Sequence, residues 1–135
     1  MQSRNTQTRN TRQRALILRA VRSRSDHPCA DDIYGDVKKA DPRVSRATVY
    51  RNLGVLCDRG EIARVKVPSA DRFDLRCDRH YHFYCVRCGA VFDAPVDYMS
   101  SIDRMAEEGS GFKVLRHRTV FEGLCPDCLL KESKK

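Results

Sequence analysis

The sequence lacks a long hydrophobic run, and its first 24 positions contain no acidic residue. No apolar segment approaches the roughly 20 residues that a membrane-spanning helix needs, so no membrane association is expected. The first residues are polar and hold no apolar stretch of the kind that a secretory signal requires. Neither an internal repeat nor a low-complexity tract is visible. The sequence therefore predicts a cytoplasmic protein of one or two small domains in its 135 residues.

Positive charge is concentrated in the first half of the chain. Residues 1–67 contain 15 Lys and Arg against 7 Asp and Glu, whereas residues 68–135 contain 11 of each. The whole net charge of +8 therefore lies in the first half, with seven arginines in residues 1–24. A basic half beside a neutral half that contains paired cysteines indicates a phosphate-binding module joined to another domain.

Residues 1–76 read as a winged helix, in which three helices precede a two-stranded hairpin. Apolar spacing predicts the helices and apolar–basic alternation predicts the strands. Ser45 is a good N-cap for the third helix, and Gly60 is a suitable stop. We expect helices over residues 11–24, 30–39 and 46–59, strands over 62–67 and 73–76, and a disordered basic tail over residues 1–9.

Residues 77–135 read as a small α/β domain. Short strands are expected over residues 81–85 and 90–92, a helix over 98–108 and a strand over 112–121. The fold class predicted for the whole chain is therefore α+β.

The third predicted helix carries a face suited to the major groove of DNA. Opposite its apolar positions it places arginine, hydroxyl and small side chains, which can reach base edges, thymine methyls and phosphates. An amphipathic helix with a solvated basic face is the plainer alternative. The candidate DNA contacts are Ser45, Arg46, Thr48, Tyr50 and Arg51, with Arg12 and Arg14 upstream.

Two Cys-x-x-Cys pairs predict a structural zinc site. Cys85 with Cys88 and Cys125 with Cys128 supply four thiolates, enough for one tetrahedral shell around Zn²⁺. Disulfides and free thiols are the alternatives, but neither pair opens a helix after a strand as a redox pair does. A closed four-thiolate shell leaves no position for a substrate, which argues against metal catalysis there. Three further cysteines, Cys29, Cys57 and Cys77, lie outside these pairs. Cys57 is expected to pack on the apolar flank of the third helix, and Cys77, close to the histidines, is a candidate reactive thiol.

A second metal site is predicted beside the first cysteine pair. His80 and His82 are two residues apart, so on a strand their side chains point to the same side. Asp74 and Asp93 offer carboxylate oxygens and His27 a third imidazole. This mixture of nitrogen and oxygen ligands suits Fe²⁺, Mn²⁺ or Zn²⁺.

With these motifs in this order, the chain resembles the ferric-uptake-regulator (Fur) family, and most of all its peroxide-sensing branch (PerR). The matching segments are 27–34, 47–53, 72–74, 80–88 and 125–128. The resemblance implies a dimeric winged-helix repressor with a C-terminal dimerisation domain over residues 77–135 and a four-cysteine structural zinc. It further implies base contacts at Tyr50 and Arg51 and regulatory ligands at His27, Asp74, His80, His82 and Asp93.

The peroxide-sensing branch is favoured because Asp74 and Asp93 are aspartates, where metal-uptake regulators more often carry glutamate. In that branch bound Fe²⁺ reacts with hydrogen peroxide and a ligand histidine is oxidised, which makes His27 and His80 the candidates here. Two departures stand out: few residues precede Thr11, and an additional ligand site of some members is reduced to His117, with Arg79, Tyr81 and Ser100 at its other positions.

The sequence therefore predicts a metal-dependent transcriptional repressor rather than an enzyme. Its partners would be a second copy of the chain and a palindromic, A/T-rich DNA duplex, and its cofactors Zn²⁺ in the structural site and Fe²⁺ or Mn²⁺ in the regulatory site. Sensing of iron, zinc or manganese availability is the alternative to sensing of peroxide. A thiol redox enzyme or a metal-dependent hydrolase is the remote alternative, since no separate general base or oxyanion donor stands out.

Overall fold

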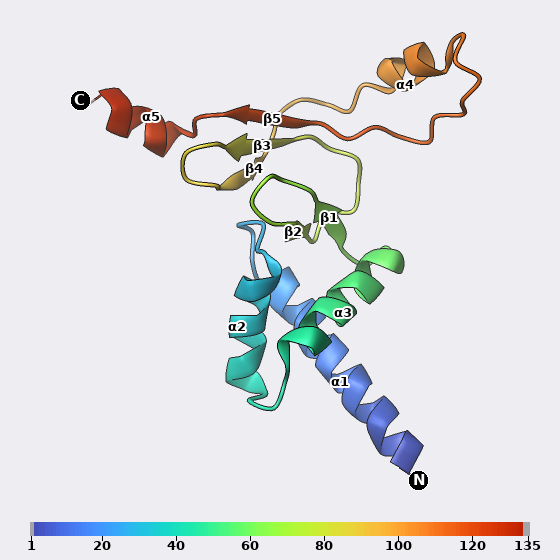
Figure 1. Cartoon of the computed structure of the whole chain (residues 1–135), viewed down its shortest axis with the longest axis vertical. Helices are drawn as coiled ribbons and strands as arrows, with labels where there is room; N and C mark the ends of the chain where they lie inside the picture. Colours follow the sequence, from blue (N-terminus) through green and yellow to red (C-terminus); the bar gives the residue numbers. More distant parts are fainter. Residues whose placement is uncertain (1, 134–135) are drawn as a thin grey trace. The chain divides into compact units, whose positions relative to one another are not determined.

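Helices make up most of the first part of the chain, and short strands form the centre of the second part (Figure 1). The computed structural model describes residues 2–133. It divides into two units, Met1–Cys77 and Asp78–Lys135, so the boundary lies one residue after the expected position. The mixture of helices and strands confirms the predicted α+β class. Within residues 2–133, no helix is long and apolar enough to cross a membrane.

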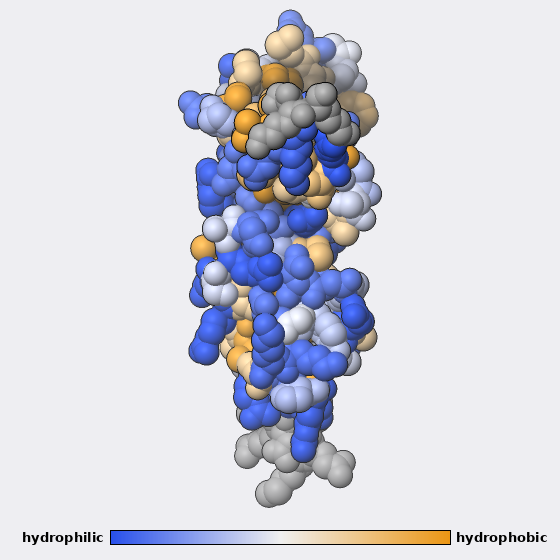
Figure 2. All heavy atoms as spheres, turned by 90° about the vertical axis from the view of Figure 1, so that its left-hand side faces the viewer, coloured by the Kyte–Doolittle hydropathy of each residue, from blue (hydrophilic) through white to orange (hydrophobic). Residues whose placement is uncertain are grey.

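The first unit is built around three helices, α1 (Gln2–Arg22), α2 (Ala30–Ala40) and α3 (Arg46–Asp58). Each contributes one apolar stripe to a common core, as expected for amphipathic helices. Hydrophilic residues cover most of the molecular face drawn in Figure 2, with hydrophobic residues in small groups between them. The fully or almost fully buried core residues are Ile17, Val21, Ile33, Val37, Val49, Leu53, Leu56 and Ile62.

Helix α1 is longer than the sequence pattern indicated. It begins at Gln2 and so includes residues 2–9, for which the sequence predicted a disordered basic tail. Residue 1 lies outside the described residues. The physical reason is that residues 2–22 contain neither proline nor glycine, while arginine and glutamine have good helix propensity.

A two-stranded antiparallel hairpin follows the helices, as a winged helix requires. Strand β1 (Ala63–Val65) pairs with β2 (Arg72–Asp74), and Arg64 lies opposite Phe73. The loop before α2 is attached to this hairpin, because the Phe73 N–H donates to the carbonyl of Pro28 over 2.9 Å. This attachment places the loop that carries His27 beside the strand that carries Asp74.

The second unit contains a three-stranded sheet in the order β4–β3–β5. Its central strand β3 (His82–Cys85) runs antiparallel to β4 (Val91–Asp93) and parallel to β5 (Val120–Gly123). The β3–β4 register places His82 directly opposite Asp93.

Two helices complete the second unit, α4 (Ser100–Glu107) and α5 (Pro126–Ser133). In Figure 1, α4 lies at the end of this unit away from α5, at the end of the extended segment 108–119. The strand predicted over residues 112–121 is therefore wrong in extent, since only residues 120–123 pair in β5. Within the described chain residues 111–119 are not paired in a strand ladder, although the Thr119 carbonyl accepts a bond of 3.3 Å from the His82 N–H at the start of β3. Without a paired neighbour an alternating segment is not a strand.

Candidate metal centres and DNA-binding face

The four paired cysteines meet at one point of the second unit. Cys85 ends β3, Cys88 lies in the turn to β4, and Cys125 and Cys128 lie at the start of α5. All four sulfur atoms lie within 4.8 Å of one another, and three of these residues are buried. The Cys85–Cys128 sulfurs are 3.7 Å apart and the Cys88–Cys125 sulfurs 3.8 Å apart.

These distances fit a metal shell and not disulfides. Four sulfurs placed 2.3 Å from a tetrahedral centre are separated by about 3.8 Å, whereas a disulfide needs about 2.05 Å. None of the seven cysteines, all of which lie within residues 2–133, forms a disulfide. The cluster therefore fits a closed structural Zn²⁺ site, as the spacing of the pairs predicted.

The turn between β3 and β4 is shaped to point sulfurs at one centre. Gly89 adopts a φ of 79°, a left-handed conformation that side-chain-bearing residues seldom adopt. Its N–H donates to the carbonyl of Cys85 over 2.8 Å, and the Cys85 N–H donates to Ala90 over 2.9 Å. The chain thereby folds back tightly enough for Cys88 to face Cys85.

Burial raises the pKa of one thiol in this cluster, whereas hydrogen bonds from backbone N–H groups lower the pKa of another. Backbone N–H groups of Cys88 and Cys125 point at the sulfur of Cys85 and lower its pKa to about 6. Desolvation instead raises the pKa of Cys128. A divalent cation would compensate the buried thiolates and favour deprotonation of the Cys128 thiol, which is how metal binding and ionisation are coupled at such sites.

In the same unit, the predicted histidines converge on one carboxylate. Nε2 of His80 lies 3.0 Å from Oδ1 of Asp93, and Nε2 of His82 lies 3.5 Å from the same oxygen. The two rings are 4.4 Å apart, and their side chains are 8% and 10% exposed. Nδ1 of His80 is 2.8 Å from the carbonyl of Asp78, so an Nδ1–H donor directs Nε2 towards Asp93. Two imidazoles and one carboxylate are thus arranged as part of a metal shell.

In the first unit, the other two predicted ligands form a pair of their own. Nε2 of His27 lies 3.3 Å from Oδ2 of Asp74, and both side chains are largely buried. His27 has a φ of 54°, an uncommon conformation for a residue other than glycine. Its carbonyl accepts a hydrogen bond of 3.2 Å from Nη1 of Arg72. A strained residue held by its neighbours is typical of functional positions.

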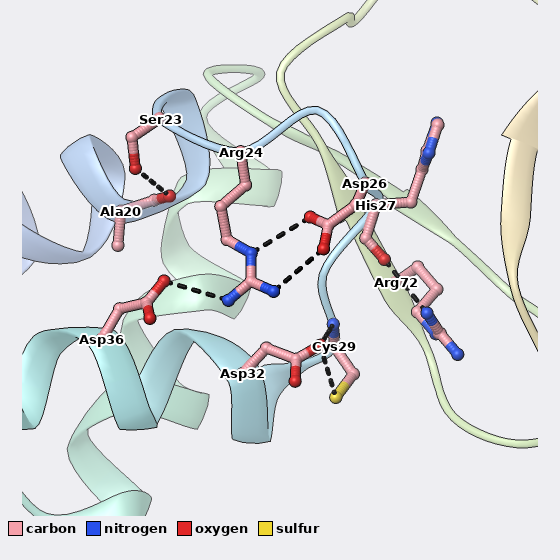
Figure 3. A network of polar contacts seen from close by, with 9 residues as sticks. All are labelled: Ala20, Ser23, Arg24, Asp26, His27, Cys29, Asp32, Asp36 and Arg72. Carbon is pink, nitrogen blue, oxygen red and sulfur yellow. Dashed lines mark hydrogen bonds and ion pairs between the residues drawn. The ribbon is translucent and has the colours of Figure 1, made fainter.

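An arginine network fixes the loop that presents His27. Arg24 donates to both carboxylate oxygens of Asp26 over 3.0 and 2.9 Å, and to Asp36 on α2 over 3.0 Å. Figure 3 shows the His27 imidazole directed away from this network. The structure therefore brings together the predicted ligands within each unit, whereas one shell made of all five remains a prediction.

The candidate DNA contacts lie on and around α3. Ser45 caps the helix, because its Oγ accepts from the Thr48 N–H over 3.1 Å. Arg46, Tyr50 and Arg51 are exposed, and Val49 on the opposite side is fully buried. The helix therefore presents the arginine and tyrosine side chains to solvent and packs its apolar stripe on the core.

Three contacts of the candidate DNA-binding residues were not predicted from the sequence. Asp31, in the first turn of α2, accepts a hydrogen bond of 2.8 Å from the Tyr50 hydroxyl and forms an ion pair with Arg46. The bond to Asp31 also raises the pKa of Tyr50. Arg14 donates over 3.0 Å to the buried side chain of Asn52, so it contributes to the α1–α3 contact, whereas Arg12 is exposed. The only sequence signal for Asp31 is its position as an acid at a helix start.

Comparison with known proteins finds metal-responsive and peroxide-responsive regulators among the similar proteins. Among relatives, the chain is 37% identical over 121 residues to the peroxide-responsive repressor PerR of Staphylococcus aureus (strain USA300), covering 89% of this chain and 82% of that protein. A peroxide stress regulator from Campylobacter jejuni superposes with a TM-score of 0.76 at 25% identity, covering 94% of this chain and 96% of that one. A zinc uptake regulator complexed with zinc and DNA superposes with a TM-score of 0.70 at 28% identity, covering 90% and 83%.

The family model of the ferric uptake regulator family matches residues 5–122, which include most of both units and the first cysteine pair. This match confirms the resemblance found in the motifs. The chain belongs to the ferric uptake regulator family.

Proposed function

We propose that this regulator is a metal-dependent, DNA-binding transcriptional repressor of the cytoplasm that responds to hydrogen peroxide. The observation that carries the proposal is the set of ligands: His27 with Asp74 in one unit, and His80 and His82 with Asp93 in the other. Both carboxylates are aspartates, and the relative from Staphylococcus aureus is named as a peroxide-responsive repressor.

One Fe²⁺ or Mn²⁺ ion bound by all five residues would link the two units. Three imidazole nitrogens and two carboxylate oxygens suit either ion. Because the ligands come from both units, the metal would favour one arrangement of the units over others, which makes DNA affinity dependent on metal. A coupling of this kind changes operator affinity by roughly 5- to 150-fold.

DNA binding is supported by charge and by the exposed face of α3. Arg46, Tyr50 and Arg51 lie on that face, and the whole positive charge excess lies in the first half of the chain. A zinc uptake regulator of similar fold is known in complex with DNA. Binding should weaken steeply with salt, because arginines release counterions from phosphates.

A second copy of the chain is the proposed partner of the second unit. Phe112 and Leu115, on the segment 108–119, are 77% and 74% exposed, and Met105 on α4 is 71% exposed. Large apolar side chains exposed together mark an interaction surface. A dimer would bury them and would match a palindromic, A/T-rich operator.

Bound Fe²⁺ supplies the redox chemistry with hydrogen peroxide, and the chain supplies the group that is oxidised. Insertion of one oxygen into a ligand imidazole consumes one hydrogen peroxide and forms one water. His27 and His80 are the proposed targets. An oxidised imidazole is a poorer ligand, so the metal-bound form is lost and the repressor leaves DNA.

The test compares three preparations by fluorescence anisotropy with an A/T-rich palindromic duplex. We expect the zinc-loaded protein to bind weakly, and added Mn²⁺ or Fe²⁺ to strengthen binding. Peroxide should abolish binding of the Fe²⁺ form only, with one added oxygen on His27 or His80 by mass spectrometry. Affinity that does not depend on the second metal contradicts the proposal. Release on metal removal without any oxidation by peroxide would instead establish a sensor of metal availability.

A further inference from the structure

A closed set of hydrogen bonds lies in the second unit next to the histidine pair. Its members are Tyr81, Tyr98, Asp103 and His117. The hydroxyl of Tyr81 is 2.5 Å from Nε2 of His117, and Nδ1 of His117 is 2.7 Å from Oδ1 of Asp103. The hydroxyl of Tyr98 donates to the other carboxylate oxygen of Asp103. We call these four side chains the Tyr81–His117 network.

Backbone groups complete the network and fix the direction of its bonds. The Met99 N–H donates to the Tyr81 oxygen and the His117 N–H donates to the Tyr98 oxygen, each over 3.0 Å. Because an ionised carboxylate only accepts, Nδ1 of His117 carries the proton and Nε2 accepts from Tyr81. This assignment of the His117 proton is inferred from the hydrogen-bond partners of the two ring nitrogens. The bonds from Tyr98 and His117 also lower the pKa of Asp103, which keeps it ionised.

Packing holds the network rigid. The His117 ring stacks on Tyr98 with centroids 4.5 Å apart, and Tyr81 contacts His117 and Phe121 at 5.5 and 6.0 Å. Tyr81 is only 3% exposed. A buried, fully bonded tyrosine has essentially one orientation, because any other would leave its hydroxyl unpaired in the interior.

The position of Tyr81 in the chain connects this rigid side chain to the two histidines. It lies between His80 and His82, and strand β3 begins only at His82, so His80 lies outside the strand ladder. The peptide between Tyr81 and His82 is held from both sides, by a bond of 2.9 Å from the Ala94 N–H to the Tyr81 carbonyl and one of 3.3 Å from the His82 N–H to the Thr119 carbonyl. The side chain of Tyr81 is a further point that fixes the rotation of this segment about its own axis, on the side towards His80.

We propose that Tyr81 and His117 are positioning residues for the metal-binding histidines His80 and His82. The inference rests on the proposed function, since it concerns the regulatory metal of that site. The network holds the backbone from which both imidazoles project, and Asp103 anchors it to α4. The orientation of the ligands is thereby coupled to the placement of α4 and of the segment 108–119. Outer groups that orient ligands commonly change metal affinity about 10-fold when they are removed.

The test removes single hydroxyl and imidazole groups and measures Mn²⁺ binding to the zinc-loaded, full-length protein. In Tyr81→Phe the ring and its packing remain and only the bond to His117 is lost. We expect Mn²⁺ affinity, followed by titration with electron paramagnetic resonance of free Mn²⁺, to fall about 10-fold. His117→Gln should give a similar loss, and the double variant should lose little more, because the two residues act as a unit.

Two controls separate positioning from general damage. Tyr84→Phe makes the same chemical change on β3 and should leave Mn²⁺ affinity unchanged. Zinc content should stay at the wild-type value in Tyr81→Phe, and the thermal midpoint should fall by only a few degrees, the scale of one lost buried hydrogen bond. In addition, ring nitrogen signals of His80 and His82 in nuclear magnetic resonance spectra recorded before Mn²⁺ is added should shift in Tyr81→Phe and not in Tyr84→Phe.

The outcomes also distinguish this inference from the proposed function. His80→Ala should abolish the tight Mn²⁺ site. If His80→Ala does so while Tyr81→Phe binds as wild type, the positioning role is overturned and the proposed function stands. If Tyr81→Phe weakens binding only together with zinc loss, or as much as Tyr84→Phe does, positioning is again overturned. If His80→Ala binds Mn²⁺ like wild type, the regulatory site and the inference both fail.

Discussion

The Tyr50 hydroxyl donates a hydrogen bond of 2.8 Å to the carboxylate of Asp31, and the same carboxylate pairs with Arg46. One acidic side chain at the start of α2 thus holds two side chains of the candidate DNA-binding face. A DNA phosphate would compete with Asp31 for both of them. The contact therefore opposes DNA binding and makes the face less attractive to phosphates in general.

The first prediction is that Asp31→Asn strengthens DNA binding. We expect an affinity gain of about threefold, the scale of an exposed ion pair, together with a steeper dependence on salt because Arg46 becomes available to phosphate. Fluorescence anisotropy at several salt concentrations measures both. The control Asp58→Asn removes an equal charge from the last turn of α3. Equal gains in the two variants would show a long-range charge effect and contradict the competition.

The second prediction concerns the four-cysteine cluster. Cys128→Ser should abolish zinc retention and lower the thermal midpoint of the second unit by about 10 °C or more, because binding of structural zinc contributes directly to folding. Metal analysis and scanning calorimetry measure these effects. Cys77→Ser, an exposed thiol outside the cluster, should change neither. Zinc at full stoichiometry in Cys128→Ser would contradict the four-thiolate shell.

The third prediction is a pH dependence that arises from Arg24 and Asp26. The Arg24 guanidinium lowers the pKa of the Asp26 carboxyl below its ordinary value of 3.8. A carboxyl with a lowered pKa in the folded state stabilises the fold above its unfolded pKa and loses that contribution as pH falls. Asp26→Asn should therefore cost about 0.5–1 kcal/mol at pH 7, a small value because Asp26 is 62% exposed and screened by water.

Urea unfolding of the wild type and of Asp26→Asn at pH 7 and pH 3 checks this. The difference between the two proteins should shrink towards zero at pH 3, where the wild-type carboxyl is increasingly protonated. A difference that persists unchanged in acid would show that Asp26 acts through something other than its charge.

The fourth prediction is that Leu115→Glu gives a monomer. This side chain is exposed on the segment 108–119, and a charge there cannot be buried in an apolar interface without a large penalty. Analytical ultracentrifugation should show the change in mass, and affinity for a palindromic duplex should fall at least tenfold. Val86→Glu, which places the same charge at an exposed apolar position of the same unit, should remain dimeric. A dimeric Leu115→Glu would place the interface elsewhere.

Local patterns in the sequence predicted much of the first unit. The stripes that include Ile33 and Val37 on α2, and Val49 and Leu53 on α3, are set by residues close in sequence, so periodicity finds them. The cysteine spacing likewise predicted the cluster at Cys85 and Cys128, because four thiols in two close pairs have few other uses.

The remaining features depend on contacts that spacing does not contain. The strand predicted over residues 112–121 was too long, since a strand exists only where a neighbour pairs with it. Helix α5 was missed because Cys125 and Cys128 were considered only as ligands, although Pro126 is well suited to a first helical position. The bond between Tyr81 and His117 joins residues 36 positions apart, and no local signal indicates it.

The central strand β3 contains the zinc ligand Cys85 and the histidine His82 within four residues. Side chains of a strand alternate between its faces, so one inserted or deleted residue reverses the face of everything beyond it. The position of both metal sites therefore depends on the register of one strand. A sequence change that alters the spacing between His82 and Cys85 would turn one of these two ligands to the wrong face of the sheet.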